Sequence, residues 1–344
     1  MKKNFSKHLK TVGYIFLFAS VTCLIIILKL LAFDGINVLW MYTTFITTFM
    51  LSRVVGSFFY IPYHKRLSPD LKSKVKDYCP EVSFIIPCKN EEKSIYHTMA
   101  NALYSDYPKN KVEVIAINDG STDNTLQEMY RVKKDFSDRK VTIVNFQVNK
   151  GKREGMAEGF KRAEGEIVIQ LDSDSFPAKA ALKEIVYPFI DKTVGATVGH
   201  TDPSNRDKNW LTKMQTAYYF MSFRALKATE SVFDMVFCCS GCFSAYRKEY
   251  VLPIIDAWRN ETFIGKKIIF GDDRALTNWM IKLGYKTVYV AEAKAYTAVP
   301  EKLKQFLKQQ VILGKHFQNL NSHLLEKQCQ EQLQVRQQIV VPRI

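Results

Sequence analysis

The sequence lacks the short motifs that mark several common enzyme classes. It has no Walker phosphate-binding loop, no GxGxxG dinucleotide fingerprint, no GxSxG nucleophile elbow and no HExxH zinc motif. Its seven cysteines are an odd number at scattered positions, which argues against a disulfide framework. Residues 238–242 supply only three thiols and no nearby histidine, so we expect no zinc site there.

Acidic residues are also in deficit. Lys and Arg number 49 against 34 Asp and Glu, which gives a net charge of +15 over 344 residues. A basic chain suits an anionic partner such as nucleic acid, acidic lipid or a phosphorylated small molecule. Much of the positive charge flanks the N-terminal apolar segments, and no recognition motif accompanies it. We therefore expect no nucleic-acid partner.

Long apolar runs occur only near the N-terminus. Residues 12–33 and 36–63 each approach the roughly 20 residues that cross a bilayer. Lysines and arginines lie before the first run and after the second, which places both flanks in the cytoplasm. We predict two transmembrane helices as a hairpin over 1–63, a basic juxtamembrane linker over 64–80, and a multi-pass protein of the plasma membrane. A cleaved signal peptide is the alternative for the first run.

Residues 81–299 have the pattern of one α/β domain. The expected strands are 82–87, 112–117, 141–145 and 166–171, and the expected helices are 94–103, 125–136 and 154–163. This alternation of β-branched strands and helices predicts a mainly parallel central sheet. Ligands of such sheets bind at the carboxyl ends of the strands, and polar clusters follow the first, second and fourth strands here.

The sharpest chemical motif is Asp172-Ser173-Asp174, directly after the fourth strand. Two carboxylates one residue apart are suited to Mg²⁺ or Mn²⁺, which would neutralise a diphosphate, whereas the alternative is a solvated acidic turn. Asp119 ends the second strand and either joins this site or caps a helix. Lys150, Lys152 and Arg153 lie at an expected helix N-terminus, which suits a phosphate as well as it suits a basic surface loop.

A second acidic motif, Asp272-Asp273-Arg274, precedes a helix expected over 275–283. A carboxylate there could act as a general base that takes a proton from an attacking hydroxyl. A helix cap or a surface salt bridge is the alternative. Residues 210–228 are rich in aromatic side chains and methionine, and their pattern fits a helix at a membrane surface as well as a helix that faces the core.

The order of these motifs resembles that of the processive, membrane-bound family 2 glycosyltransferases, and is most similar to the hyaluronan synthase and chitin synthase-like branch. The motifs are Ile85-Ile86-Pro87, Asn90-Glu91, Asp119-Gly120-Ser121, Gly151-Lys152-Arg153, Asp172-Ser173-Asp174, Ser240-Gly241-Cys242 and Gly271-Asp272-Asp273-Arg274. The resemblance covers about residues 80–310. It implies a GT-A fold and inverting transfer of a sugar from a UDP-sugar donor to a growing polysaccharide, with GlcNAc alone or alternating with GlcA.

The resemblance also implies roles for individual side chains. Asp273 is the expected catalytic base, and Asp174 is the expected ligand of a Mg²⁺ or Mn²⁺ cofactor. The expected nucleotide-sugar site comprises Pro87, Asn90, Glu91, Asp119, Lys152, Asp172, Gln309 and Gln310. The expected acceptor site comprises Ser240, Gly241, Cys242, Asp272 and Arg274.

The C-terminal part departs from the family pattern. Family members carry Q-x-x-R-W on an amphipathic interface helix, which we expect here over 300–314. Gln309 and Gln310 fit that motif, but residues 311–314 are Val-Ile-Leu-Gly where the Arg-Trp pair belongs. Residues 315–344 form a polar, glutamine-rich tail with no apolar run of spanning length, where the family has further transmembrane helices.

The departure suggests a truncated or frameshifted product, or else a genuinely shortened synthase. Three functional hypotheses follow. The first is an active transferase that is bound to a lipid membrane and transfers sugar from a UDP-sugar donor to a polysaccharide acceptor. The second is a degenerate synthase that binds nucleotide or a partner without catalysis. The third is a non-processive transferase to a lipid acceptor. A homo-oligomer that completes a polymer channel is left open.

Overall fold

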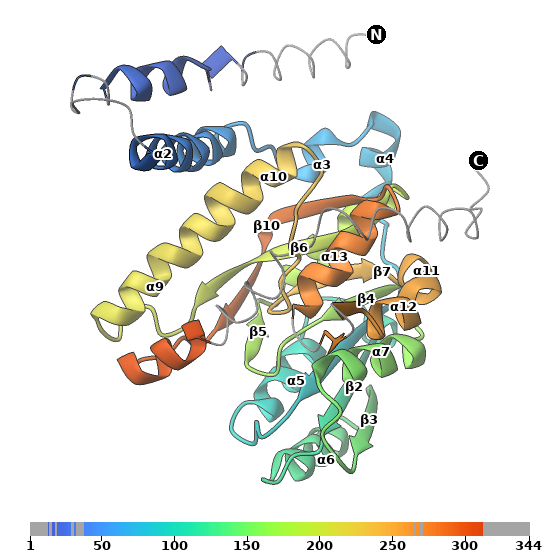
Figure 1. Cartoon of the computed structure of the whole chain (residues 1–344). Helices are drawn as coiled ribbons and strands as arrows, with labels where there is room; N and C mark the ends of the chain where they lie inside the picture. The colour runs from blue at the N-terminus through green and yellow to red at the C-terminus, as the bar shows by residue number, and fades with distance from the viewer. Residues whose placement is uncertain are drawn as a thin grey trace.

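The computed structural model describes residues 13, 16–17, 19–28, 31, 38–263, 266–268 and 271–311 (Figure 1). The helices include α2 (Val38–Ser57), α3 (Tyr63–Arg66), α4 (Pro69–Lys74), α5 (Ile95–Leu103), α6 (Thr125–Asp135), α7 (Lys152–Arg162), α8 (Ala181–Val186), α9 (Trp210–Phe220), a π-helix (Met221–Lys227), α10 (Ala228–Val232), α11 (Lys248–Val251), α12 (Ile255–Arg259) and α13 (Asp272–Lys282). The strands are β1 (Val82–Cys88), β2 (Val112–Asp119), β3 (Lys140–Phe146), β4 (Ile167–Gln170), β5 (Ser175–Pro177), β6 (Val194–Pro203), β7 (Ser244–Arg247), β8 (Thr262–Phe263), β9 (Lys266–Lys267) and β10 (Lys286–Thr297). Residues 303–311 are also helical.

The described residues form one eight-stranded sheet in the order β3-β2-β1-β4-β7-β6-β10-β5. The first four strands are parallel, as the sequence predicts. The rest of the sheet is mixed, because β7 is antiparallel to both β4 and β6, and β5 is antiparallel to β10. The expectation of a mainly parallel sheet is therefore wrong for this half. The chain re-enters the sheet at Ser244, opposite the last residue of β4, so β7 must run the other way.

The sheet is covered by helices on both faces, and its strands alternate their side chains between two cores. Phe84 and Ile86 of β1 pack with Met99 of α5 on the face that α5, α6 and α8 cover. Ile85 packs with Phe160 of α7 on the face that α7, α12 and α13 cover. Burial of each such side chain contributes about 1.5–3 kcal/mol. These two cores fix the sheet and leave the carboxyl ends of β1, β2 and β4 side by side.

The N-terminal helices do not bear out the expected transmembrane hairpin. Helix α2 forms within the second apolar run, but none of the described helices is long and apolar enough to cross a membrane. Four threonines and Arg53 lower the mean hydropathy of α2. The first apolar run lies only partly within the described residues. Residues 34 and 35, between the two apolar runs, lie outside them, as do residues 312–314 and the polar tail.

Helix α2 crosses the long helical segment that runs from α9 through the π-helix to α10 (Figure 1). The Arg53 guanidinium pairs with Glu230 of α10, and the Thr229 hydroxyl donates to the Arg53 carbonyl. Thr44 and Thr48 of α2 are buried, whereas Phe45 on another side of the helix is 67% exposed. Helix α2 thus packs through small side chains and leaves large apolar ones uncovered.

Candidate active site

Asp119 ends β2 and shapes the loop that precedes α7. Its two carboxylate oxygens accept the backbone N–H groups of Lys150 and Gly151, at 2.7 and 2.9 Å. The next residue, Gly120, has a φ of 64°, and a Cβ there would lie 2.6 Å from the Asn149 nitrogen. Asp119 therefore holds the loop of the GKR motif. Its expected contact with a nucleotide stays a prediction.

The loop after β1 is tied to the loop after β2. Asn90, with a φ of 56°, accepts the Thr122 backbone N–H at 2.9 Å, and its own N–H donates to the Ser121 hydroxyl. The Glu91 backbone N–H donates to Thr125. Pro87 is buried inside β1. The Asn90-Glu91 motif and the Asp119-Gly120-Ser121 motif are thus neighbours, because the parallel strands that precede them end at the same edge of the sheet.

Gly241 is the point at which the site's charged groups converge. A Cβ at this position would lie 2.6 Å from Gln170 Nε2 and 2.9 Å from both Asp172 Oδ1 and Lys152 Nζ. The Asp172 backbone N–H donates to the Gly241 carbonyl. Lys152 Nζ and Asp172 Oδ1 are 2.5 Å apart. Burial works to lower the pKa of Lys152, but Asp172 and nearby carboxylates outweigh it and raise that pKa above its ordinary value.

Asp273 faces this cluster from the first turn of α13. Its Oδ1 accepts Gln170 Nε2 at 2.6 Å, and its Oδ2 accepts the Gly241 backbone N–H at 2.7 Å. Two neutral donors therefore orient the expected base. The sequence analysis missed Gln170, although a glutamine at the end of an otherwise apolar buried strand was the signal that could have identified it. Gln170 is 1% exposed.

Asp272 bonds to Arg153, whereas Asp273 bonds to Gln170 and Gly241. Arg153 is 3% exposed, and its Nε donates to Asp272 Oδ1 at 3.0 Å. Its NH1 donates to the Trp258 carbonyl and to Glu261. Burial raises the pKa of Asp272, and the nearby Lys152 and Arg153 oppose that rise. Arg153 thus joins the N-termini of α7 and α13. The expected acceptor role of Asp272 and the expected phosphate role of Arg153 stay predictions.

Asp174 lies beside Asp172, and burial, followed by the charges of Asp172 and Glu91, raises its pKa to about 6. No cluster of three or more metal-ligating side chains occurs within the described residues. A carboxylate pair nevertheless fits Mg²⁺ or Mn²⁺, because such ions commonly use one or two carboxylates together with substrate phosphates. These residues therefore fit a cation that arrives with a diphosphate.

A cavity of about 390 Å³ opens beside the 238–242 loop. Its lining residues are Met214, Gln215, Tyr218, Tyr219, Ser222, Phe223, Lys227, Ser240, Cys242, Phe306, Gln309 and Gln310. We call it the aromatic cavity. The Ser240 hydroxyl is buried and has no hydrogen-bond partner within the described residues. Burial, and then the charges of Asp172 and Asp174, raise the pKa of the Cys242 thiol well above its usual range.

The aromatic cavity brings together residues that the sequence analysis assigned to different sites. Ser240 and Cys242 were expected at an acceptor site, whereas Gln309 and Gln310 were expected at the nucleotide sugar. All four line the same cavity.

Arg274 follows Asp273 in α13. Burial raises the pKa of the Cys238 thiol, and the cations of Lys227 and Arg274 oppose that rise.

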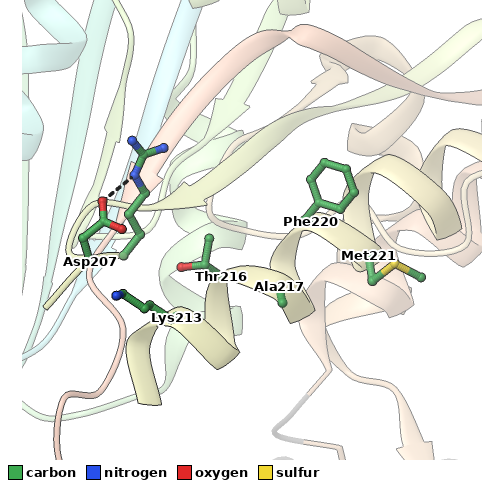
Figure 2. A pocket seen from close by; sticks show the side chains of 7 residues that line it. Asp207, Lys213, Thr216, Ala217, Phe220 and Met221 are labelled. Atoms are coloured by element: carbon green, nitrogen blue, oxygen red, sulfur yellow. Dashed lines mark hydrogen bonds and ion pairs between the residues drawn. The ribbon is translucent and has the colours of Figure 1, made fainter. Parts of the chain in front are cut away.

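A second hollow, of about 500 Å³, lies along α9 (Figure 2). Arg206 and Asp207 form an ion pair at one end, and Phe220 and Met221 lie at the other. None of the predicted catalytic residues lines it. This surface hollow is therefore not the candidate site.

Comparison with known proteins identifies the family. The model of "Glycosyl transferase family 2" matches residues 83–254, which contain β1 from its second residue, β2 to β7 and the loops between them. The chain belongs to glycosyltransferase family 2. Related family members include N-acetylglucosaminyltransferases and hyaluronan synthases, and the chain is a hexosyltransferase.

Two sequence relatives and one solved structure illustrate the match. A hyaluronan synthase from Streptococcus pyogenes is 33% identical over 316 residues, which cover 91% of this chain and 71% of the relative. An N-acetylglucosaminyltransferase from Azorhizobium caulinodans is 31% identical over 70% of this chain and 60% of the relative. A mannosyltransferase from Pyrobaculum calidifontis, solved with GDP-Man and Mn²⁺, has a TM-score of 0.54 at 23% identity over 75% of this chain and 68% of that chain. The last likeness confirms the GT-A fold.

Proposed function

We propose that this family 2 enzyme transfers GlcNAc, alone or alternating with GlcA, from a UDP-sugar to the end of a growing polysaccharide, with inversion at the anomeric carbon. The observation that carries the proposal is the convergence at Gly241. Lys152 and Asp172 lie on one side of this glycine, and Asp273 accepts its backbone N–H. A group suited to a diphosphate and a group suited to proton removal thus share one small space.

The residues divide the reaction between them. Asp273 takes the proton of the acceptor hydroxyl as that oxygen bonds to the anomeric carbon. The bond from that carbon to the diphosphate breaks on the opposite face, and UDP leaves with the electron pair. Lys152 offsets the charge that develops on the leaving group. A divalent cation held by Asp172 and Asp174 would supply further neutralisation there.

The choice of sugar and acceptor rests on the relatives. One relative is named as a hyaluronan synthase and another as an N-acetylglucosaminyltransferase. The aromatic cavity supports a carbohydrate acceptor, because aromatic side chains and an unpartnered hydroxyl offer both an apolar face and a polar contact. Its volume, about 390 Å³, is within the range of small-ligand sites.

The test is UDP release by the purified full chain with UDP-GlcNAc and UDP-GlcA, singly and together, with and without Mn²⁺. We expect metal-dependent release that Asp273→Asn reduces by a factor of about 10² to 10⁴. The Asp273→Asn protein should still bind UDP, because Asp273 lies on the acceptor side. Release that is equal in both proteins, or absent with every donor although UDP binds, would refute the catalytic proposal.

We further propose a lipid surface as a partner. Helix α2 exposes large apolar side chains, and so does α9, which continues into the π-helix that α2 contacts. On α2 they include Phe45 and Phe49, and on α9 they include Trp210 and Tyr218. Exposed apolar patches of this kind mark interaction sites, and the net charge of +15 favours an anionic surface. Co-flotation with anionic vesicles, and its loss in a Phe45→Ser/Phe49→Ser variant, would support the proposal; unchanged flotation of that variant would refute it.

A further inference from the structure

Lys227 is a buried cation in the wall of the aromatic cavity. The residue is 8% exposed and ends the π-helix Met221–Lys227. Its ammonium group donates to the Cys238 carbonyl and lies 5.2 Å from the centroid of the Phe223 ring. π-Helical turns are rare and often occur at functional sites, because the wider turn changes the direction of the side chains that follow.

No acidic side chain of the described residues lies within 4 Å of this ammonium group as an ion-pair partner. The other described residues that line the cavity are uncharged. An ammonium ion has three donors, and the contacts above use one of them. Burial of a charge is costly unless an opposite charge pairs with it. The arrangement is therefore suited to an anion that enters with a ligand.

The cavity also indicates where that anion sits relative to the reaction. Ser240 and Cys242 line the same cavity, and Gly241 between them donates its N–H to Asp273. Lys227 holds the carbonyl of Cys238 at the start of this loop. The other cation of the site, Lys152, is occupied by Asp172 on the diphosphate side. Lys227 is thus a separate positive centre on the acceptor side of the base.

We infer that Lys227 binds the carboxylate of a hexuronic acid at the end of the acceptor chain, so that the aromatic cavity prefers an acidic sugar to a neutral one. This inference rests on the proposed function and specifies the acceptor class for the same site. It gives the enzyme a means to add a neutral sugar onto a uronate end. A chain that carried only neutral sugars would leave the buried cation without an anionic partner.

The inference is tested by direct binding of two tetrasaccharides to the purified full chain, measured by titration calorimetry in the presence of UDP. One probe alternates GlcNAc and GlcA and ends in GlcA at its non-reducing end; the other is chitotetraose, which is neutral. Lys227→Met should weaken the acidic probe about tenfold or more and leave the neutral probe within twofold. Lys227→Arg, which keeps the charge, should retain most of the binding.

Lys213→Met is the matched control, because Lys213 is an exposed lysine of α9 outside the aromatic cavity. It should change neither probe. Unchanged UDP affinity and thermal unfolding in Lys227→Met would show that the fold survives. Equal weakening of both probes by Lys227→Met, or weakening of neither, would overturn the inference. Because binding needs no turnover, this result is independent of whether sugar transfer is detected.

A kinetic arm separates two sources of the carboxylate. With UDP-GlcNAc as donor, Lys227→Met should raise KM for the GlcA-ended acceptor about tenfold. With UDP-GlcA as donor and a GlcNAc-ended acceptor, KM for the donor should stay within twofold. The reverse pattern would mean that Lys227 binds the uronate of the donor, and it would overturn the assignment to the acceptor.

Discussion

The carboxyl edge of β1, β2 and β4 and the aromatic cavity beside it are built in opposite ways. At the edge, charged groups are numerous and already engaged: Asp119 holds a loop, Lys152 pairs with Asp172, and Arg153 pairs with Asp272. In the cavity, every lining side chain except Lys227 is uncharged. Two of its polar groups, the Ser240 hydroxyl and the Lys227 ammonium, can form further hydrogen bonds.

This difference indicates a division of labour. A diphosphate is the same in every reaction cycle, so a rigid network of paired charges can be shaped for it in advance. The end of a polymer changes as it grows, and apolar faces with a few polar contacts tolerate that change better. Gly241 lies at the boundary, because its carbonyl accepts from Asp172 and its N–H donates to Asp273.

Gly241→Ala should disrupt the contact between the charged edge and the aromatic cavity, and we expect it to reduce activity more than any other substitution considered below. Its Cβ would lie within 3 Å of Gln170, Asp172 and Lys152, so these side chains must move. We expect turnover to fall about a hundredfold, since a displacement of about 1 Å at a catalytic centre costs that much. Steady-state UDP release measures the loss.

Ser240→Ala is the matched control for that variant. It removes a hydroxyl from the aromatic cavity and adds no bulk. We expect a severalfold rise in the KM for the acceptor with the KM for the donor unchanged, because one neutral hydrogen bond contributes about 1 kcal/mol. Full activity in Gly241→Ala, or a changed donor KM in Ser240→Ala, would contradict the proposed boundary.

Gln170→Met should affect the base without changing either binding region. Asp273 Oδ1 would lose a donor at 2.6 Å, while the Gly241 N–H would still hold Oδ2. We expect kcat to fall about tenfold, with the KM for UDP-sugar within twofold, since supporting groups around a functional centre typically contribute factors of 10 to 100. A change in KM alone would show that Gln170 contacts substrate instead.

Mn²⁺ affinity should depend on pH through Asp174, whose pKa is raised to about 6. A carboxylate binds a metal only when deprotonated, so Mn²⁺ should bind about tenfold more weakly at pH 5 than at pH 7. The pH dependence of folding has the opposite direction. The metal-free native state keeps the Asp174 proton up to a higher pH than the unfolded state does, so the free energy of unfolding falls as pH rises from about 4 to 6. Electron paramagnetic resonance titration of Mn²⁺ with UDP tests the first effect.

Asp174→Asn is the control for that titration. It should bind Mn²⁺ more weakly at both pH values and lose most of the difference between them. Equal Mn²⁺ affinity of the unsubstituted chain at pH 5 and pH 7 would contradict a role for Asp174 as a ligand.

Asp191 provides a reference point outside both regions, and its effect should be the smallest. Burial works to raise its pKa, but hydrogen bonds from Thr193 and Tyr63 and the charge of Lys286 lower it to about 2. Its stabilising contribution is therefore present above about pH 4 and is lost as pH falls towards 2. Asp191→Asn should reduce the free energy of unfolding by about 1 kcal/mol at pH 7, as measured by urea unfolding, with unchanged kcat. A kinetic effect would mean that the two ends of the sheet are coupled.

The first half of the fold was accessible from sequence because its signals are local. Alternating strands and helices predicted β1 to β4 and α5 to α7 with boundaries close to those observed. The later strands were missed. β6 and β10 pair across more than eighty residues of chain, and their residues carry no local turn or repeat that announces the pairing. β7 runs antiparallel because it begins opposite the last residue of β4, and the pattern of hydrophobic residues does not show where a strand enters the sheet.

The candidate site shows the same limit. Asp119, Lys152, Asp172 and Asp273 were identified because short motifs mark them, and the structure places the last three around Gly241. Gln170, which orients Asp273, belongs to no such motif. Gln309 and Gln310 were expected at the nucleotide sugar, and the structure places them in the same cavity as Ser240 and Cys242. The position of the helix over 303–311 is set by packing, and the order of motifs along the sequence does not show which residues that helix packs against.

The sequence by itself determined the family, the α/β architecture and the acidic residues that chemistry requires, because each of these is encoded in contiguous residues. Only the tertiary structure decided which charges are already paired and which remain available. Arg153 and Lys227 are both basic residues of helices, but one is buried against two carboxylates and the other faces a neutral cavity. Their different functions follow from the elements packed against them, since the energy of a buried charge depends on its surroundings.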